Sequence, residues 1–136
     1  MMTYQFIDGD YPSKILSSGS LGAMGTGLPY AIGTQISNPN KLVINIDGDS
    51  SFMTTMSYMK TIIENKLPIK IAIMNDSKQI MVNIWEKLYF EDRYVASDNI
   101  RNPSFTELIR SFDFNVFKCS SNDNLQQVTN KFLSNN

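Results

Sequence analysis

The fold is decided by residues 42–74, which read LVINIDGDSSFMTTMSYMKTIIENKLPIKIAIM. Leu42 to Ile46 and Ile69 to Met74 are short apolar runs rich in β-branched residues, so each predicts a buried strand. Between them, residues 52–65 carry apolar side chains at helical spacing, and Leu67-Pro68 ends that helix. A strand, a helix and a second strand in this order predict two parallel strands joined by a helical crossover.

The same alternation continues on both sides of this unit. We expect further helices over residues 25–37, 78–88 and 122–133, and one that ends at Phe112 and starts at the cap Asn102-Pro103-Ser104, with proline in its first turn. Short strands are expected at Lys14 to Ser17 and at Asn115 to Lys118, and a polar loop at residues 89–101. The predicted fold class is therefore α/β, a parallel sheet with helices on both faces, in a single domain over residues 1–136.

Composition excludes several classes of protein. The 136 residues are 42% hydrophobic, which suits one domain with a core. No apolar run approaches about 18 residues, so no membrane span is expected. The first residues lack the basic-then-apolar pattern of a secretion signal. The net charge of −1 gives no electrostatic reason for a nucleic acid partner.

Cysteine and histidine usage limits the chemistry further. Cys119 is the single cysteine, so no internal disulfide can form and a cytoplasmic, reducing location is expected. The chain contains no histidine, which removes Ser-His and Cys-His triads and histidine metal sites. Carboxylates, amides, hydroxyls, backbone groups or a cofactor must supply any chemistry.

Two acidic turns follow the two central strands. Asp49 and Asp76 lie 27 positions apart, one strand-helix-strand unit, and parallel sheets bind ligands at the carboxyl ends of their strands. Two carboxylates with neighbouring carbonyls form a hard oxygen site suited to Mg²⁺, and Ser50 and Ser51 open a helix whose N–H groups favour an anion. These residues predict a metal-bridged diphosphate, although Asp and Ser after a strand are also ordinary turn and cap formers.

Several motifs carry a resemblance to a known family. Gly48-Asp49-Ser50 followed by Asn75-Asp76 resembles the thiamine diphosphate motif that begins Gly-Asp-Gly and ends Asn-Asn. Further motifs are similar to the C-terminal cofactor-binding domain of acetolactate synthases. They are residues 21–33, 47–54 and 67–71, Met81-Val82 with Trp85, Arg93-Tyr94, and Pro103-Ser104-Phe105. The resemblance covers Ser17 to Phe114, and residues 1–12 form a poorly matched N-terminal extension.

The resemblance implies thiamine diphosphate and Mg²⁺ as cofactors and 2-keto acids as substrates, in decarboxylation or carboligation. The metal ligands would be Asp49, Asp76 and the backbone carbonyl of Lys78. Met24 would support the bent cofactor. The full cofactor-binding set implied is Gly22, Met24, Gly48, Asp49, Ser50, Ser51, Asp76, Ser77, Gln79, Ile80, Met81 and Val82.

The resemblance also implies that this chain is half of an active site. The glutamate that activates the cofactor lies in a separate pyrimidine-binding domain in this family, so no catalytic residue is assigned here. We expect that domain on a partner chain or in a homo-oligomer. Ser50, Asp76 and Ile80 depart from the family pattern, which favours the alternative of a non-catalytic remnant used for binding or assembly. A separate alternative is an unrelated α/β nucleotide binder.

Overall fold

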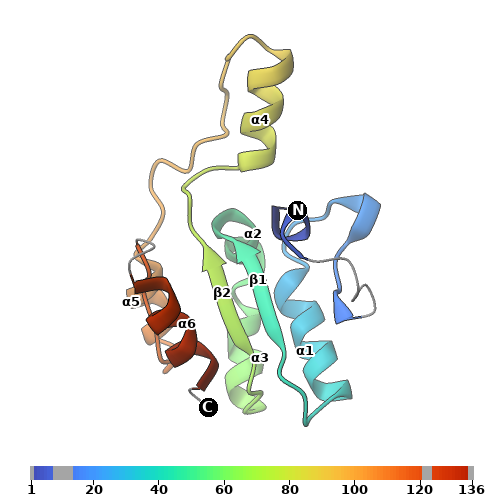
Figure 1. Cartoon of the computed structure of the whole chain (residues 1–136), viewed down its shortest axis with the longest axis vertical. Helices are drawn as coiled ribbons and strands as arrows, with labels where there is room; N and C mark the ends of the chain where they lie inside the picture. Colours follow the sequence, from blue (N-terminus) through green and yellow to red (C-terminus); the bar gives the residue numbers. More distant parts are fainter. Residues whose placement is uncertain (1, 8–13, 121–123, 135–136) are drawn as a thin grey trace.

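The computed structural model describes residues 2–7, 14–120 and 124–134 (Figure 1). Residues 1 and 8–12 of the expected N-terminal extension lie outside them. In chain order the elements are η1 (Met2–Gln5), η3 (Gly19–Leu21), α1 (Gly27–Ser37), β1 (Ile44–Gly48), α2 (Asp49–Thr55), α3 (Tyr58–Glu64), β2 (Lys70–Met74), α4 (Ile80–Tyr89), α5 (Phe105–Arg110) and α6 (Leu125–Ser134).

The sheet of the described residues consists of β1 and β2, which run parallel. Their register pairs Ile44 with Lys70 and Gly48 with Met74, so both strands end at the same edge. The turns that follow the strands therefore begin side by side (Figure 1). This confirms the α/β class and the parallel pairing predicted from the two apolar runs.

One face of this sheet forms the core. Along β1, Asn45 and Asp47 are buried whereas Ile44 and Ile46 are exposed. On the buried side, α1 and α2 pack against the strands, and the Phe52 ring meets Phe105 of α5 edge to face with centroids 6.0 Å apart. The buried apolar residues are Leu28, Ala31, Ile32, Val43, Phe52, Met59, Ile62, Ile69 and Ile109. This core fixes β1 and α2, and with them the turn that joins the two.

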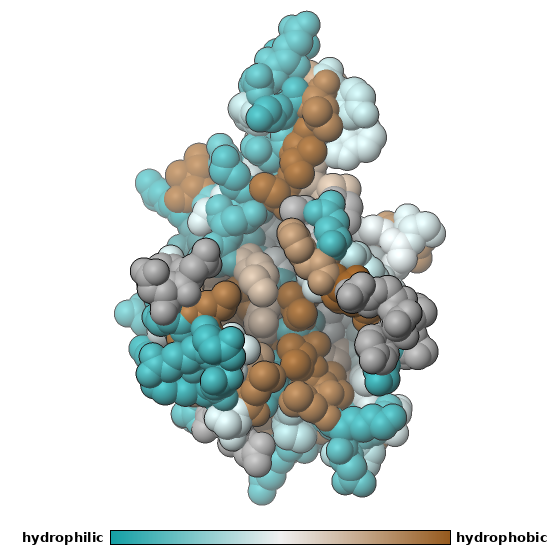
Figure 2. All heavy atoms as spheres, in the orientation of Figure 1, coloured by the Kyte–Doolittle hydropathy of each residue, from teal (hydrophilic) through white to brown (hydrophobic). Residues whose placement is uncertain are grey.

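The opposite face is apolar as well. Ile44, Ile46 and Met74 are at least two-fifths exposed there, and Figure 2 shows hydrophobic surface over the strands. In the part of the chain that the structure describes, α1 and α2 pack against the face of β1 that buries Asn45 and Asp47. The face of β1 that carries Ile44 and Ile46 is therefore left exposed.

The two outer strand predictions are wrong. Residues 15–17 and 115–118 have no regular secondary structure. A strand needs a partner to satisfy its backbone groups, and neither segment pairs with β1 or β2. Val116 nevertheless packs against the core, so its apolar character reflects burial rather than strand pairing.

Three helices differ from their predicted bounds. The helix expected over 52–65 begins at Asp49 and is divided into α2 and α3, where Met59 N–H donates to the carbonyl of Met56. This three-residue spacing tightens the turn and interrupts the α-helical ladder. Ser104 caps α5 by accepting from Glu107 N–H at 3.4 Å, so Pro103 precedes the cap instead of following it. The final helix is α6, and residues 122 and 123 of its predicted range lie outside the described residues.

Candidate functional site

Asp49 is the first residue of α2 and follows β1 directly. Gly48 is extended, with φ −78° and ψ 157°, and turns the chain from strand into helix. Asp49 is only 1% exposed, and its Oδ1 accepts from Ser50 N–H at 2.9 Å. A buried carboxylate needs partners for its remaining lone pairs, so the groups around Oδ2 define the site.

Two asparagines from a distant loop supply those partners. Asn99 Nδ2 donates to Asp49 Oδ2 at 3.1 Å and to Ser50 Oγ at 2.5 Å. Asn102 Nδ2 donates to Asp49 Oδ2 and, at 3.0 Å, to Asn75 Oδ1. Asn102 thus joins the turn after β1 to the turn after β2. No sequence pattern indicated this link, because Asn99 fell in a region expected to be a polar loop and Asn102 in an expected helix cap.

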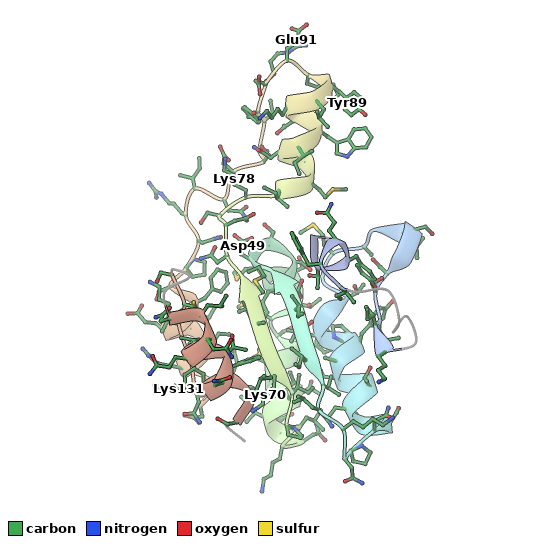
Figure 3. The ribbon with its side chains drawn as sticks, viewed as in Figure 1. Asp49, Lys70, Lys78, Tyr89, Glu91 and Lys131 are labelled. Carbon is green, nitrogen blue, oxygen red and sulfur yellow. The ribbon has the colours of Figure 1, made fainter. Side chains whose placement is uncertain are left out.

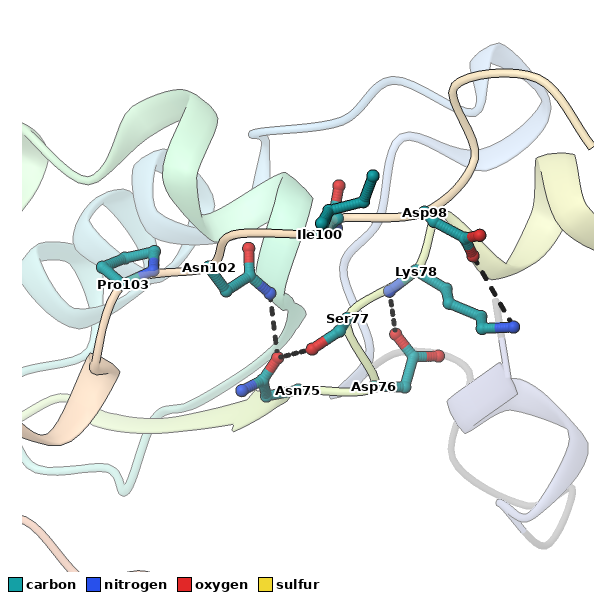
Figure 4. Close-up of a pocket in the computed structure, with 9 residues that line it drawn as sticks. Asn75, Asp76, Ser77, Lys78, Asp98, Ile100, Asn102 and Pro103 are labelled. Carbon is teal, nitrogen blue, oxygen red and sulfur yellow. Dashed lines mark hydrogen bonds and ion pairs between the residues drawn. The ribbon is translucent and has the colours of Figure 1, made fainter.

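The second turn, residues 75–78, is exposed, and Figure 4 draws its side chains together with the loop residues that line the same pocket. Asp76 Oδ1 accepts from Lys78 N–H at 3.1 Å, and Lys78 Nζ lies 3.6 Å from Asp98 Oδ1. Ser77 has a left-handed backbone, φ 59°, and its carbonyl accepts from Asn99 N–H at 2.8 Å. The side chain that the structure links to Asp49 is therefore Asn75, one residue before the predicted ligand.

A pocket of about 500 Å³ lies over this second turn. Asp76, Ser77 and Lys78 line it from the β2 side, and Asn99 and Asn102 line it from the loop. Figure 3 shows Asp49 at the ends of the strands, with Lys78 further along toward α4. Asp76 therefore lines the same pocket as Asn99 and Asn102, the two residues that donate to Asp49.

The loop that carries Gly22 and Met24 is held by α2. Gly25 N–H donates to Ser51 Oγ at 2.9 Å, and Thr55 Oγ1 donates to the Gly25 carbonyl at 2.9 Å. Gly25 has φ +75°, and a Cβ there would lie 2.9 Å from Thr55 Cγ2. The Met24 side chain is half exposed beside this anchor. In this structure the Ser51 hydroxyl therefore positions the Met24 loop.

The remaining predicted residues lie where the chain enters α4. Gln79 N–H donates to the Ser97 carbonyl at 2.7 Å, whereas Ile80, Met81 and Val82 occupy the first turn of α4 and are exposed. α4 extends beyond the ends of the strands (Figure 1), and Trp85 and Tyr89 stack on it with centroids 4.8 Å apart. These apolar residues do not meet the Asp49 cluster.

Asp47 is a second buried acid with a different environment. It is 8% exposed, and its Oδ2 has no hydrogen-bond partner among the described residues. Burial raises the pKa of Asp47, and hydrogen bonds from the Ser51 side chain and the Gly48 backbone act in the opposite direction. A Cβ on Gly27 would lie 2.6 Å from Asp47 Oδ2. Asp47 is packed against α1 and belongs to the core side of the sheet.

The oxygen atoms at this edge of the sheet are of the kind that ligate a small hard cation. The described residues contain no group of three or more acidic, histidine or cysteine side chains placed to hold a metal ion. Asp49 Oδ2 instead accepts from the Asn99 and Asn102 amides, and Asp76 and Lys78 line the pocket that the same two asparagines border. Mg²⁺ takes such oxygens and commonly shares its coordination with phosphates, so the residues fit a cation that completes its shell from a diphosphate.

The fold and this arrangement define a cofactor-binding α/β domain, and comparison with known proteins identifies the family. The family model described as "Thiamine pyrophosphate enzyme, C-terminal TPP binding domain" matches residues 1–136. The chain belongs to this family, as its motifs predicted.

Relatives point to one group within the family. The chain is 37% identical over 123 residues to acetolactate synthase, mitochondrial, of Schizosaccharomyces pombe, which covers 90% of this chain and 18% of that protein. It is 42% identical over 112 residues to the acetolactate synthase large subunit of Porphyra purpurea, covering 82% and 19%. It is 32% identical over 134 residues to the acetolactate synthase isozyme 2 large subunit of Escherichia coli K12, covering 98% and 24%. The chain therefore spans less than a quarter of these relatives.

No helix among the described residues has the length and apolar character needed to cross a bilayer.

Proposed function

We propose that this chain supplies the thiamine diphosphate- and Mg²⁺-binding half of an acetolactate synthase-like enzyme that acts on 2-keto acids. One observation carries the proposal: the buried Asp49 after β1 is joined through Asn102 to Asn75 after β2. The two turns predicted to share a cation are thereby linked at one edge of the sheet. The names of the relatives support the acetolactate synthase assignment.

In this proposal the cation is held by Asp49, Asp76 and the carbonyl of Lys78. When bound, thiamine diphosphate supplies the electron sink for decarboxylation or carboligation. The chain's own residues bind and orient it: Met24 supports the bend, held by Ser51 and Thr55 through Gly25. The diphosphate contacts proposed are Gly48, Ser50, Ser51, Ser77, Gln79 and Ile80, with Gly22, Met81 and Val82 beside the organic part of the cofactor.

The proposal requires a pyrimidine-binding domain from outside these 136 residues, for example one on a partner chain or in a second subunit. Exposed apolar side chains on α4 support such a contact. Trp85, Leu88 and Tyr89 are each more than half exposed, and large exposed apolar patches mark interaction surfaces. The pyrimidine-binding domain would also bring the activating glutamate. We further propose a cytoplasmic location from the single Cys119, although the fungal relative is named mitochondrial.

A second candidate is a remnant that binds or assembles without turnover. It is favoured by Asp76, which stands at the amide ligand position of the motif and whose side chain bonds its own turn instead of the Asp49 cluster. A carboxylate there adds negative charge beside a diphosphate and weakens binding.

Calorimetric titration with thiamine diphosphate and Mg²⁺ separates the two. The proposed function predicts saturable binding that Asp49→Asn weakens at least tenfold. Glu64→Gln is the matched control, since it removes one charge from an exposed carboxylate paired with Lys60, and it should bind like the original protein. Asp76→Asn should tighten binding. Absence of binding in the original protein together with recovery in Asp76→Asn would support the remnant, and absence in both would overturn the cofactor assignment.

A further inference from the structure

The Asp49 carboxylate is occupied by the chain's own amides. Asn99 and Asn102 both donate to the same oxygen, Asp49 Oδ2, and their second bonds reach Ser50 Oγ and Asn75 Oδ1. Each amide nitrogen therefore bridges Asp49 Oδ2, which the proposed cation would use, to a second oxygen of the same two turns. An amide N–H₂ carries partial positive charge and no lone pair for a metal, so neither amide can stay on Asp49 Oδ2 where a cation binds that oxygen.

We propose that Asn99 and Asn102 form an amide clasp that holds Asp49 Oδ2 and that a bound cation displaces. This inference rests on the proposed function of the site. The clasp satisfies Oδ2 of a carboxylate that is 1% exposed and whose Oδ1 accepts from Ser50 N–H. A buried carboxylate oxygen with no partner would carry a high cost. When the cation takes Asp49 Oδ2, the two amides lose that acceptor and turn away.

The backbone of the loop is suited to this exchange. Gln79 N–H donates to the Ser97 carbonyl at 2.7 Å, and Asn99 N–H donates to the Ser77 carbonyl at 2.8 Å. These bonds fasten residues 97–99 to the turn after β2 without using any side chain of the clasp. Asn102 lies beyond them, with Pro103 directly after it. The amides can therefore be exchanged for a cation while the loop stays attached to the second turn.

The clasp opposes binding, because its hydrogen bonds must break before the cation enters. Hydrogen bonds to a charged group are stronger than neutral ones. Removing one amide should therefore tighten binding of Mg²⁺ and thiamine diphosphate, by about tenfold for Asn102→Ala. An amide that instead helped to hold the cation, or that merely kept the loop folded, would give weaker binding when removed.

The experiment measures the dissociation constant of Mg²⁺ with thiamine diphosphate by calorimetry, for the original 136-residue chain, Asn102→Ala and Asn99→Ala. Asn65→Ala is the control, because the Asn65 amide donates to the carbonyl of Thr61 and touches no carboxylate. Circular dichroism establishes that each variant is folded. A second readout is the side-chain N–H₂ resonance of Asn102 in ¹⁵N spectra, which should shift when Mg²⁺ and thiamine diphosphate are added.

Tighter binding in Asn102→Ala or Asn99→Ala, with Asn65→Ala unchanged and a shifted Asn102 resonance, supports the clasp. Equal or weaker binding in both clasp variants, while the original chain binds, overturns the clasp and leaves the proposed function intact. If neither the original chain nor either clasp variant binds, both the clasp and the proposed function fail.

Discussion

Replacing Gly25 with alanine tests how the Met24 loop is held. Gly25 has φ +75°, and its new Cβ would lie 2.9 Å from Thr55 Cγ2 and 3.1 Å from Thr54 Cβ. The left-handed backbone costs about 1–2 kcal/mol for a residue with a Cβ. Forcing the methyl group against the two threonines adds about 1–3 kcal/mol. Gly25→Ala should therefore lower the free energy of unfolding by about 2–5 kcal/mol.

Two other glycines separate these contributions. Gly22 also has a positive φ, +58°, but nothing lies within 4 Å of its Cβ position, so Gly22→Ala should show the backbone cost alone. Gly33 lies inside α1 with open space around it, so Gly33→Ala should raise stability by about 0.5–1 kcal/mol.

Urea unfolding of the three variants, followed by circular dichroism, gives the comparison from their midpoints and slopes. Gly25→Ala should also weaken thiamine diphosphate binding, because displacing residue 25 from Ser51 and Thr55 displaces the neighbouring Met24. If Gly25→Ala is as stable as Gly22→Ala, the threonine contacts do not restrain this loop and the reasoning fails.

Three further predictions concern stability. Burial raises the pKa of Asp47, so the ionised side chain opposes folding. The contribution of Asp47 to stability is most favourable below its unfolded pKa, near 3.8, and this contribution is lost as the pH rises through the folded pKa. Asp47→Asn should then be more stable than the original protein at pH 7, by about 1.4 kcal/mol for every pH unit that separates the folded pKa from the unfolded one, and the gap should close on acidification; a constant gap from pH 7 to pH 4 would contradict this. Phe52→Ala removes a fully buried ring and should cost about 3–5 kcal/mol in urea unfolding, whereas a loss below about 1 kcal/mol would mean that the ring is not part of the core. Ser104→Ala removes the cap of α5 and should cost about 1 kcal/mol, with Ser120→Ala, at an exposed position outside regular structure, as the neutral control; equal midpoints for the two serine variants would show that the cap does not hold α5.

Local signals predicted the elements that carry the site. β1 and β2 are short apolar runs bounded by turn residues, and α1 and α4 match their predicted helices to within two residues. These elements can be predicted because each is determined by residues that are close together in the sequence. The segments at 15–17 and 115–118 resemble strands equally well, but a strand requires a partner, and that depends on the rest of the sheet.

The candidate site was predictable in part. Asp49 and the second turn followed from the position of the two strands, and the family motifs added Met24. The partners of Asp49 did not follow, because Asn99 and Asn102 lie 50 and 53 positions away in a loop without periodicity. Such pairing is set by how the loop folds back over the sheet edge, which no local pattern records. The role of Ser51 in holding Gly25 depends equally on a contact across 26 positions.

The most direct test of the shared cation is a crystal structure of the chain with Mn²⁺ and thiamine diphosphate, with the metal located by its anomalous scattering. Mn²⁺ takes the same octahedral oxygen sites as Mg²⁺. We predict a metal peak about 2.1 Å from oxygens of both Asp49 and Asp76, with diphosphate oxygens completing its shell and the Asn102 amide turned away. A metal bound elsewhere, or bound to only one of the two aspartates, would contradict the account.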